Sequence, residues 1–168
     1  MQLLVIRHGV AEQAEKFAAT GQDDSRRPLT KAGKRKMKEG AAGLREIVET
    51  LDVIGASPLL RAQQTAEIVA KAYDDLPVST VQALSPGSDP SDVVEWLNEH
   101  ASAEVVAIVG HEPHLPSLVT WLMTGARESR VELSKGGAAL LEFPQRAARG
   151  SGTLQWLLTG SQLRRIGE

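Results

Sequence analysis

The chain has 168 residues, of which 42% are hydrophobic and 24% are charged, and its formal net charge is −2. This length predicts a single globular domain over residues 1–168, and the near-neutral charge argues against a partner made of nucleic acid. The absence of cysteine excludes disulfides, thiolate metal sites and a cysteine nucleophile.

The apolar run at residues 1–7 is too short for the core of a signal peptide, and no stretch approaches the length of a membrane span. We therefore expect a cytoplasmic protein with no membrane partner. No large apolar segment is left without a place in the predicted core, so we also expect a monomer.

The first half of the chain predicts two strands, each followed by a helix. Leu3–Ile6 is continuously apolar and indicates a buried strand, and Asp52–Ala56 indicates a second one. Thr30 is the expected N-cap of the first helix, and Ser57-Pro58 starts the next, with Pro58 near its first position. Helical spacing predicts the buried stripe of the first helix: Met37, Ala41, Leu44, Ile47 and Leu51.

The second half continues this alternation and ends in a predicted hairpin. Val78–Leu84 indicates a strand, Pro90 begins a helix, and Val105–Val109 is the most apolar strand, which places it centrally. Ala138–Phe143 and Leu154–Leu158 predict two late strands joined by a short loop. Strands alternating with helices predict an α/β layered fold.

Two histidines follow buried strands at equivalent positions. His8 comes after the first strand and His111 directly follows the central one, while Arg7 precedes His8 and Arg61 lies in the first turn of a helix. Ligands bind at the carboxyl ends of strands in open α/β sheets, so these four side chains are expected in one crevice. Arginine forks and a helix N-terminus favour an anion, and phosphate fits them best.

A histidine in such a crevice can act as a nucleophile when a hydrogen-bond partner fixes its tautomer. In-line attack on phosphorus would give a phosphohistidine, and water would then release phosphate. Negative charge spreads over the equatorial oxygens in the transition state, so positioned cations would carry most of the catalysis.

Four stretches of the chain resemble the histidine phosphatase superfamily, the phosphoglycerate-mutase-like proteins. They are Leu4–Gly9, Arg27–Thr30 with the later Gly33, Ser57–Ala66 and Gly110–Pro113. The short length makes the chain most similar to the SixA-type phosphohistidine phosphatases. The resemblance runs from residue 2 to the last strand.

The resemblance implies a role for each residue of the crevice. His8 would be the phosphorylated nucleophile, Arg7 and Arg61 would bind the phosphoryl oxygens, and His111 would donate to the phosphoryl group. It implies no metal and no cofactor. The implied fold is phosphoglycerate-mutase-like, a mostly parallel central sheet with helices on both faces.

One departure from the family bears on the substrate. Many relatives carry an acid that protonates the leaving group after the strand corresponding to Val78–Leu84, but this chain has Ala83 there. Asp89 and Asp92 follow, and we do not expect them to reach the crevice. An alkoxide needs such a donor more than the imidazole of a phosphohistidine does. The sequence therefore favours protein phosphohistidine as substrate.

Two other functions stay open: a phosphomonoesterase acting on a small phosphorylated metabolite, and a non-catalytic module that binds phosphate or a phosphoprotein. Near the crevice, Glu112 could orient a histidine or face water, and we expect it to face water. His114 could lie on the pocket rim or on the surface. A basic run opens the first predicted helix against its dipole and is either a solvated face or a steering surface for an acidic partner. It consists of Lys31, Lys34, Arg35, Lys36 and Lys38.

Overall fold

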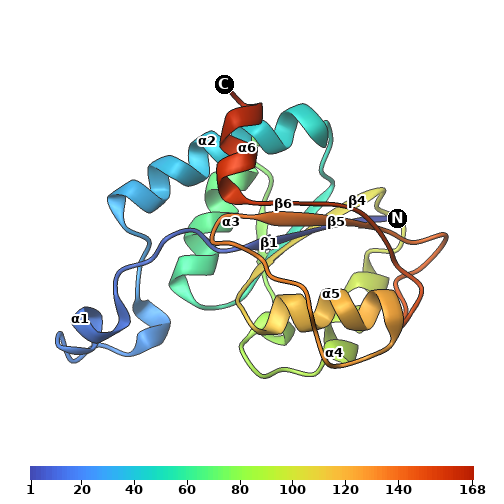
Figure 1. The fold of residues 1–168 in the computed structure, drawn as a ribbon, viewed down its shortest axis with the longest axis horizontal. Helices are drawn as coiled ribbons and strands as arrows, with labels where there is room; N and C mark the ends of the chain where they lie inside the picture. Colours follow the sequence, from blue (N-terminus) through green and yellow to red (C-terminus); the bar gives the residue numbers. More distant parts are fainter.

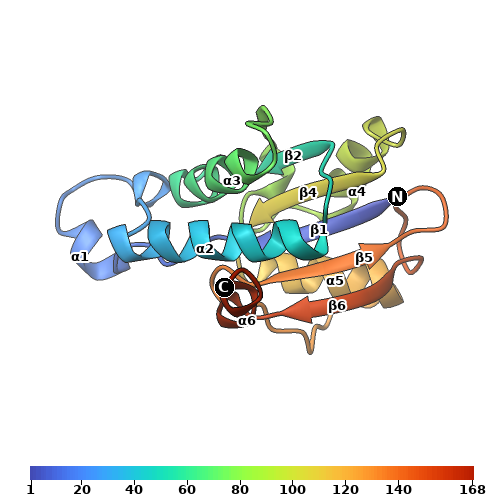
Figure 2. The same ribbon diagram turned by 90° about the horizontal axis from the view of Figure 1, so that it is seen from above.

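The computed structural model describes residues 1–168 and contains six strands in one sheet. The strands are β1 (Gln2–Arg7), β2 (Val53–Ala56), β3 (Val78–Thr80), β4 (Val105–Gly110), β5 (Ala138–Glu142) and β6 (Thr153–Leu158). Their order is β3-β2-β4-β1-β5-β6, with parallel pairing from β3 to β1 and antiparallel pairing from β1 to β6 (Figure 2). The predicted α/β class and mostly parallel sheet are confirmed.

Helices cover both faces of this sheet, as predicted (Figure 1). The helices are α1 (Ala14–Ala18), α2 (Lys31–Ile47), α3 (Leu60–Ala72), α4 (Pro90–Glu99), α5 (His114–Thr124) and α6 (Gly160–Ile166). Two short 3-10 helices lie at Asp24–Arg26 and Gln82–Leu84. Helices α2, α3 and α6 share one apolar cluster with the sheet, and α4 and α5 share the other.

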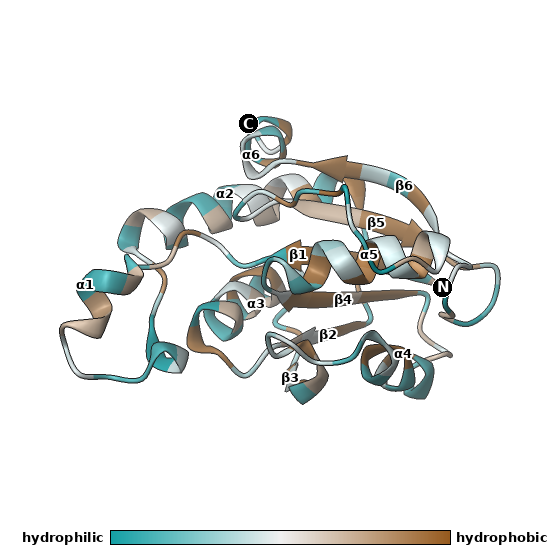
Figure 3. Cartoon of the chain, turned by 60° about the horizontal axis from the view of Figure 1, so that its bottom comes forward, coloured by the Kyte–Doolittle hydropathy of each residue, from teal (hydrophilic) through white to brown (hydrophobic).

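The two apolar clusters meet at the central strands β1 and β4. Leu4 and Ile6 of β1 belong to one cluster and Leu3 and Val5 to the other, as the alternation of side chains along a strand requires. All six residues of β4 are buried, which confirms its predicted central place. Figure 3 shows these strands as the most hydrophobic part of the chain. The residues that follow β1 and β4 are therefore attached to the central, buried strands of the sheet.

The prediction of a strand over residues 78–84 is correct for Val78–Thr80 and wrong for the residues that follow. β3 ends at Thr80, and Gln82–Leu84 forms a 3-10 helix. Val81 and Leu84 are buried while the two residues between them are less so. A spacing of three residues suits a helical turn, in which positions i and i+3 lie on one side.

Several predicted helix boundaries also move. Ile47 was predicted in the buried stripe but is 38% exposed, because α2 ends there and Val48 turns into the core in its place. Leu51 is buried beyond the helix. α3 begins at Leu60, so Pro58 precedes the helix instead of opening it.

α6 was not predicted, although its start carries a sequence signal. Thr159 accepts a hydrogen bond from the backbone N–H of Gln162, and the Gln162 side chain accepts one from the Thr159 N–H. This reciprocal pair is a capping box, which a Thr-x-x-Gln sequence indicates. None of the helices combines the length and the apolar composition that crossing a bilayer requires.

Candidate active site

The four residues predicted to share a crevice lie together at the carboxyl edge of the sheet. His8 follows β1, His111 follows β4, and their ring centroids are 5.1 Å apart. The two strands pair in parallel up to Arg7 and Gly110, which brings the residues after them side by side. Arg61 reaches this edge from the first turn of α3.

The backbone fixes the tautomer of His8. Its Nδ1 lies 2.7 Å from the carbonyl oxygen of Gly9, which can only accept, so Nδ1 carries the proton. Nε2 therefore keeps its lone pair, makes no hydrogen bond and is not among the buried unpaired atoms. Burial, followed by the charges of Arg61 and Arg7, lowers the pKa of His8 to about 4, although the bond to Gly9 opposes this. At neutral pH His8 is an uncharged imidazole with a free nitrogen.

Gly9 holds this arrangement through a close approach to α2. A Cβ at Gly9 would lie 2.6 Å from Cγ of Met37, which is tighter than real side chains tolerate. The Gly9 N–H donates to Thr65 Oγ1 at 3.1 Å, and Thr65 Oγ1 donates to the carbonyl of Arg61 at 2.7 Å. The loop after β1 is thereby tied to the helix that carries Arg61.

His111 is held by a serine at the end of β2. Its Nε2 lies 2.7 Å from Oγ of Ser57, and both residues are buried. Burial, with the neighbouring charges of His8 and Arg61, lowers the pKa of His111 to about 3. Its Nδ1 is buried and has no partner. When the Ser57 hydroxyl donates to Nε2, the proton of the neutral ring resides on Nδ1.

Arg7 is positioned by Glu112, which is exposed, as predicted, and also pairs with the Arg7 guanidinium. The Arg7 Nη1 donates to Oε2 of Glu112 at 2.8 Å and to the carbonyl of Leu133 at 2.6 Å. The Glu112 side chain is 32% exposed, so it lies at the mouth of the site with its carboxylate engaged. The Nε of Arg7 stays free of any partner.

Arg61 is positioned by a segment that the sequence-based site did not include. Its Nη1 lies 3.1 Å from the carbonyl of Asp24 and 3.2 Å from the Asp24 carboxylate. That carboxylate also accepts from Arg27 Nε at 2.7 Å, and the bond to Arg27 is the main cause that lowers the pKa of Asp24. Arg27 also helps to lower the pKa of His8, so it adds a third positive charge near the nucleophile. The sequence did offer one indication of this role, because Arg27 lies in the Arg-Pro-Leu-Thr stretch that resembles the family.

Three buried nitrogens at this edge have no hydrogen-bond partner within the protein. They are Nε of Arg7, Nε of Arg61 and Nδ1 of His111. Leaving a buried polar group unpaired costs about 1–3 kcal/mol, so such a cluster indicates a ligand with acceptor atoms. An oxyanion matches their charge, and a phosphoryl group offers several acceptor oxygens at once. No group of three or more His, Asp or Glu side chains is arranged to hold a metal ion.

Ala83 occupies the position where many relatives carry a carboxylic acid, so no acid there can protonate a leaving group. The carboxylate of Asp89 caps α4, accepting from the N–H and the hydroxyl of Ser91, and it pairs with Arg127 at 3.3 Å. The bonds to Ser91 lower the pKa of Asp89, so it stays ionised at neutral pH. His114, predicted at the rim or on the surface, is 7% exposed and lines a neighbouring cavity.

Comparison with known proteins gives consistent results. Residues 3–85 match the model of the histidine phosphatase superfamily (branch 1). An uncharacterized protein of Picosynechococcus is 33% identical over 139 residues, 82% of each chain. The phosphohistidine phosphatase SixA of Escherichia coli is 29% identical over 168 residues, which cover 98% of this chain and 97% of SixA.

Solved structures extend the match to the whole fold. A structure of the protein histidine phosphatase SixA complexed with tungstate has a TM-score of 0.82 and 27% identity, covering 97% of this chain and 99% of that one. The α-ribazole phosphatase from Shigella flexneri shares the fold, with a TM-score of 0.73, 19% identity and coverage of 95% and 97%. With its strand-end histidines and the unpaired donors around them, the chain belongs to the histidine phosphatase superfamily, resembles SixA over nearly its whole length, and is a phosphatase.

Proposed function

We propose that this phosphatase hydrolyses protein phosphohistidine through a covalent intermediate on His8, without a metal or another cofactor. The observation that carries the proposal is the free Nε2 of His8 beside three buried donors that lack partners. The nucleophile is held in the reactive tautomer, and the donors suit the oxygens of the group it would attack. A similar structure, that of SixA complexed with tungstate, supports the proposal because it shows a protein of this fold with a bound oxyanion.

In the first step the lone pair of His8 Nε2 forms a bond to phosphorus. The bond from phosphorus to the substrate nitrogen breaks, and its electron pair returns to the substrate imidazole, which leaves as a neutral ring if its other nitrogen is protonated. The unpaired donors of Arg7, Arg61 and His111 bind the equatorial oxygens as charge develops there.

In the second step water attacks phosphorus on the phosphorylated enzyme. The bond from His8 Nε2 to phosphorus breaks and the ring regains its lone pair, while the water oxygen and one of its protons become a hydroxyl of inorganic phosphate and its second proton passes to another phosphate oxygen. The bond from His8 Nδ1 to the Gly9 carbonyl keeps the ring in the same orientation through both steps. Aligned reacting groups of this kind lower the barrier by avoiding the entropy cost of orientation.

The proposed substrate follows from the leaving group. Asp89 is ionised and bound to Ser91 and Arg127, and Glu112 is engaged with Arg7, so neither carboxyl is free to donate a proton. An imidazole leaving group needs less protonation than an alkoxide. Protein phosphohistidine therefore ranks above a small phosphate ester. A small phosphorylated metabolite is the second candidate, favoured by a cavity of about 290 Å³ that starts three residues after His111.

The test is phosphate release in the presence of EDTA, from a phosphohistidine protein and from an alkyl phosphate ester such as glycerol phosphate. We expect faster turnover of phosphohistidine, and a loss of at least about 10³-fold in His8→Ala, because a nucleophile cannot be replaced by its surroundings. His100→Ala is the matched control, since it removes a histidine from the end of α4. Rapid quenching should trap an acid-labile, alkali-stable phosphoenzyme in the wild type alone.

Each other outcome changes the proposal in a defined way. Equal or better turnover of the ester favours the small-metabolite substrate over the protein. Loss of activity with EDTA contradicts the metal-free reaction. Normal activity of His8→Ala would contradict the covalent mechanism itself. The absence of a phosphoenzyme in the wild type would do the same.

A further inference from the structure

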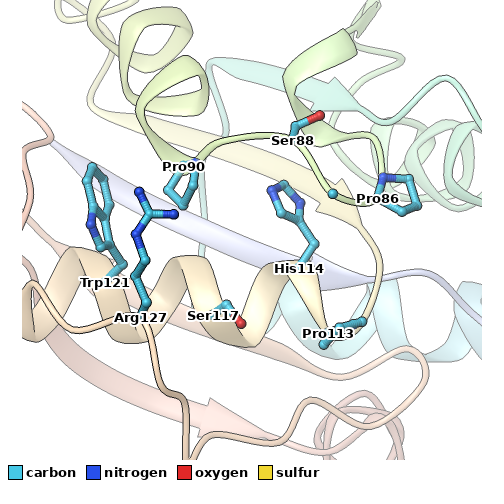
Figure 4. Close-up of a pocket in the computed structure, with 9 residues that line it drawn as sticks. Pro86, Ser88, Pro90, Pro113, His114, Ser117, Trp121 and Arg127 are labelled. Carbon is cyan, nitrogen blue, oxygen red and sulfur yellow. The ribbon is translucent and has the colours of Figure 1, made fainter.

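A cavity of about 290 Å³ lies between α5 and the loop that leads into α4 (Figure 4). His114, Ser117 and Trp121 line it from α5, at a spacing that puts them on one face of the helix. Pro86, Ser88 and Pro90 line it from the facing loop. None of the residues assigned above to phosphoryl binding lines this cavity.

The cavity lies along the first two turns of α5, close in sequence to the site residue His111. His114 follows His111 by three residues and is one of the charges that help to lower the pKa of His111. Trp121 lies seven residues further along α5, about 10 Å at 1.5 Å per residue. A group attached to a phosphorus atom near His8 and His111 could therefore extend along this face of α5.

His114 is the only strongly polar group buried in the cavity wall, and neither of its ring nitrogens has a hydrogen-bond partner. Its ring points into the space between the two walls (Figure 4), and the residue is 7% exposed. Burial lowers the pKa of His114, and the nearby backbone of Ser88 opposes this without forming a well-aligned hydrogen bond. The neutral ring offers one donor and one acceptor, and leaving both unused is costly.

The other walls suit a flat, uncharged group. Pro86, Pro90 and Pro113 line the space together with Trp121. The single charge at the rim, Arg127, is paired with the Asp89 carboxylate at 3.3 Å and is therefore offset. A second phosphate or a carboxylate would find no unpaired cation here, whereas a heterocycle would bury its faces and meet His114 at its edge.

We propose that this cavity binds the leaving group of the substrate and selects a neutral nitrogen heterocycle, such as the imidazole of phosphohistidine, with His114 as its hydrogen-bond partner. The inference rests on the proposed function, because it takes the phosphorus atom to be attacked by His8. It assigns substrate choice to α5 and the loop before α4, and phosphoryl transfer to the ends of β1 and β4.

The test compares two small substrates that differ in their leaving groups, phosphoimidazole with a ring and acetyl phosphate without one. Ser117→Tyr fills the cavity from α5, and Ser102→Tyr makes the same change at an exposed turn position. We expect Ser117→Tyr to lower the ratio of kcat/KM for phosphoimidazole over acetyl phosphate by about tenfold or more, a usual scale for pocket contacts. Ser102→Tyr should leave the ratio unchanged.

A second pair of variants examines the hydrogen bond. His114→Phe keeps a ring and removes both nitrogens, so the same ratio should fall, while His114→Gln restores a donor and an acceptor and should recover part of it. A purely structural role would lower turnover of both substrates together. Equal losses for the two substrates, or no loss with either variant, would overturn the proposal.

Direct binding separates this inference from the proposed function. Imidazole added to the wild type should shift the NMR signal of the Trp121 indole N–H, and Ser117→Tyr should abolish the shift. If imidazole binds in this way but no phosphoenzyme forms, the covalent mechanism fails and the cavity assignment stands. If a phosphoenzyme forms but the Trp121 signal does not respond, the leaving-group assignment fails alone.

Discussion

The carboxyl edge of the sheet presents two kinds of surface within a short distance. Around His8 the side chains are charged, hydrogen-bonded and fixed by neighbours on several elements, as for Arg7 with Glu112 and Arg61 with Asp24. Along α5 the walls are proline rings and Trp121, and the one buried polar group, His114, has no partner. The surface around His8 is suited to bind a charged group, and the surface along α5 is suited to bind an uncharged group of matching shape.

This difference divides the work of a phosphatase in physical terms. Positioned donors stabilise the charge that every phosphoryl transfer develops, so their effect should not depend on the leaving group. Apolar walls distinguish leaving groups by size and polarity, and they do little for the phosphorus atom itself. Changes on the charged side should therefore affect all substrates equally, and changes along α5 should be selective.

After removal of the nucleophile itself, the largest expected effect on the charged side is that of Arg61→Ala. Removing this guanidinium takes away a buried donor and a charge, so kcat/KM should fall about 10²–10³-fold for phosphoimidazole, acetyl phosphate and phosphoprotein alike. Arg130→Ala is the matched control, because Arg130 is exposed and pairs only with Glu128. Steady-state kinetics on the three substrates would measure it. A loss restricted to one substrate would contradict the claim that the charged surface acts on all substrates alike.

The residues of the charged surface were also easier to predict from the sequence than those along α5. His8 and His111 follow the two most apolar strands, and rigid strand ends fix where such residues lie, so Leu3–Ile6 and Val105–Val109 were sufficient to place them. Residues that act through tertiary contacts were not visible. Ser57, for example, reaches His111 only because β2 and β4 pair, and sequence spacing does not encode that distance.

The segment directly after β3 was predicted least well, for the same reason. Gln82–Leu84 was expected to continue β3, but burial of Val81 and Leu84 on one side of a turn overrides the local preference for a strand. The sequence around His114 did not indicate whether it is buried, since a histidine at the first residue of a helix can face solvent or protein. Its burial depends on how the loop before α4 packs over α5.

The protonation of His8 gives a second test of the charged surface. In an unfolded chain a histidine has a pKa of about 6.5, whereas in the fold the pKa of His8 is lowered to about 4. Between these pH values the unfolded chain binds more protons, so this histidine makes the free energy of unfolding rise with pH from about 4 to about 6.5, by roughly 3 kcal/mol, and adds no further change above.

Urea unfolding from pH 4 to pH 7.5 would measure this effect, with His8→Gln as the comparison because glutamine does not titrate in the range. The wild type should lose more stability than the variant as the pH falls from 6.5. Titration of the His8 ring by NMR should give the same low midpoint. Parallel stability curves, or a midpoint near 6.5, would mean that the site does not hold His8 in its neutral form.

A smaller effect is expected from the serine that positions His111. Ser57→Ala removes the bond to His111 Nε2, and with it the preference for a proton on Nδ1, where the phosphoryl group would accept it. Groups that orient a ligand or a catalytic side chain typically contribute 10-fold to 100-fold, so we expect a loss of about tenfold in kcat with little change in KM. Ser102→Ala serves as the exposed control. A change in KM alone would show that Ser57 acts on binding and not on the histidine.

The smallest effect concerns the basic run on α2, which lies outside both surfaces. Its five members, Lys31, Lys34, Arg35, Lys36 and Lys38, are all exposed, and among them only Arg35 has an ion-pair partner, Glu39 at 3.8 Å. Exposed charges act over about 8–10 Å at physiological ionic strength, so they affect the encounter with a large charged partner more than with a small one. A role in steering would therefore appear in the association rate of a phosphoprotein.

Reversal of two charges, Lys34→Glu with Lys38→Glu, should lower kcat/KM for an acidic phosphoprotein a few-fold at low salt, and the loss should shrink as salt is added. The same variant should hydrolyse acetyl phosphate as the wild type does. Its helix should be slightly more stable, because an acidic residue in the first turn of α2 favours the helix dipole, so unfolding cannot explain a loss of activity. Equal effects on both substrates would show that the run is a solvated face, and recognition of the protein substrate would then depend on the cavity along α5.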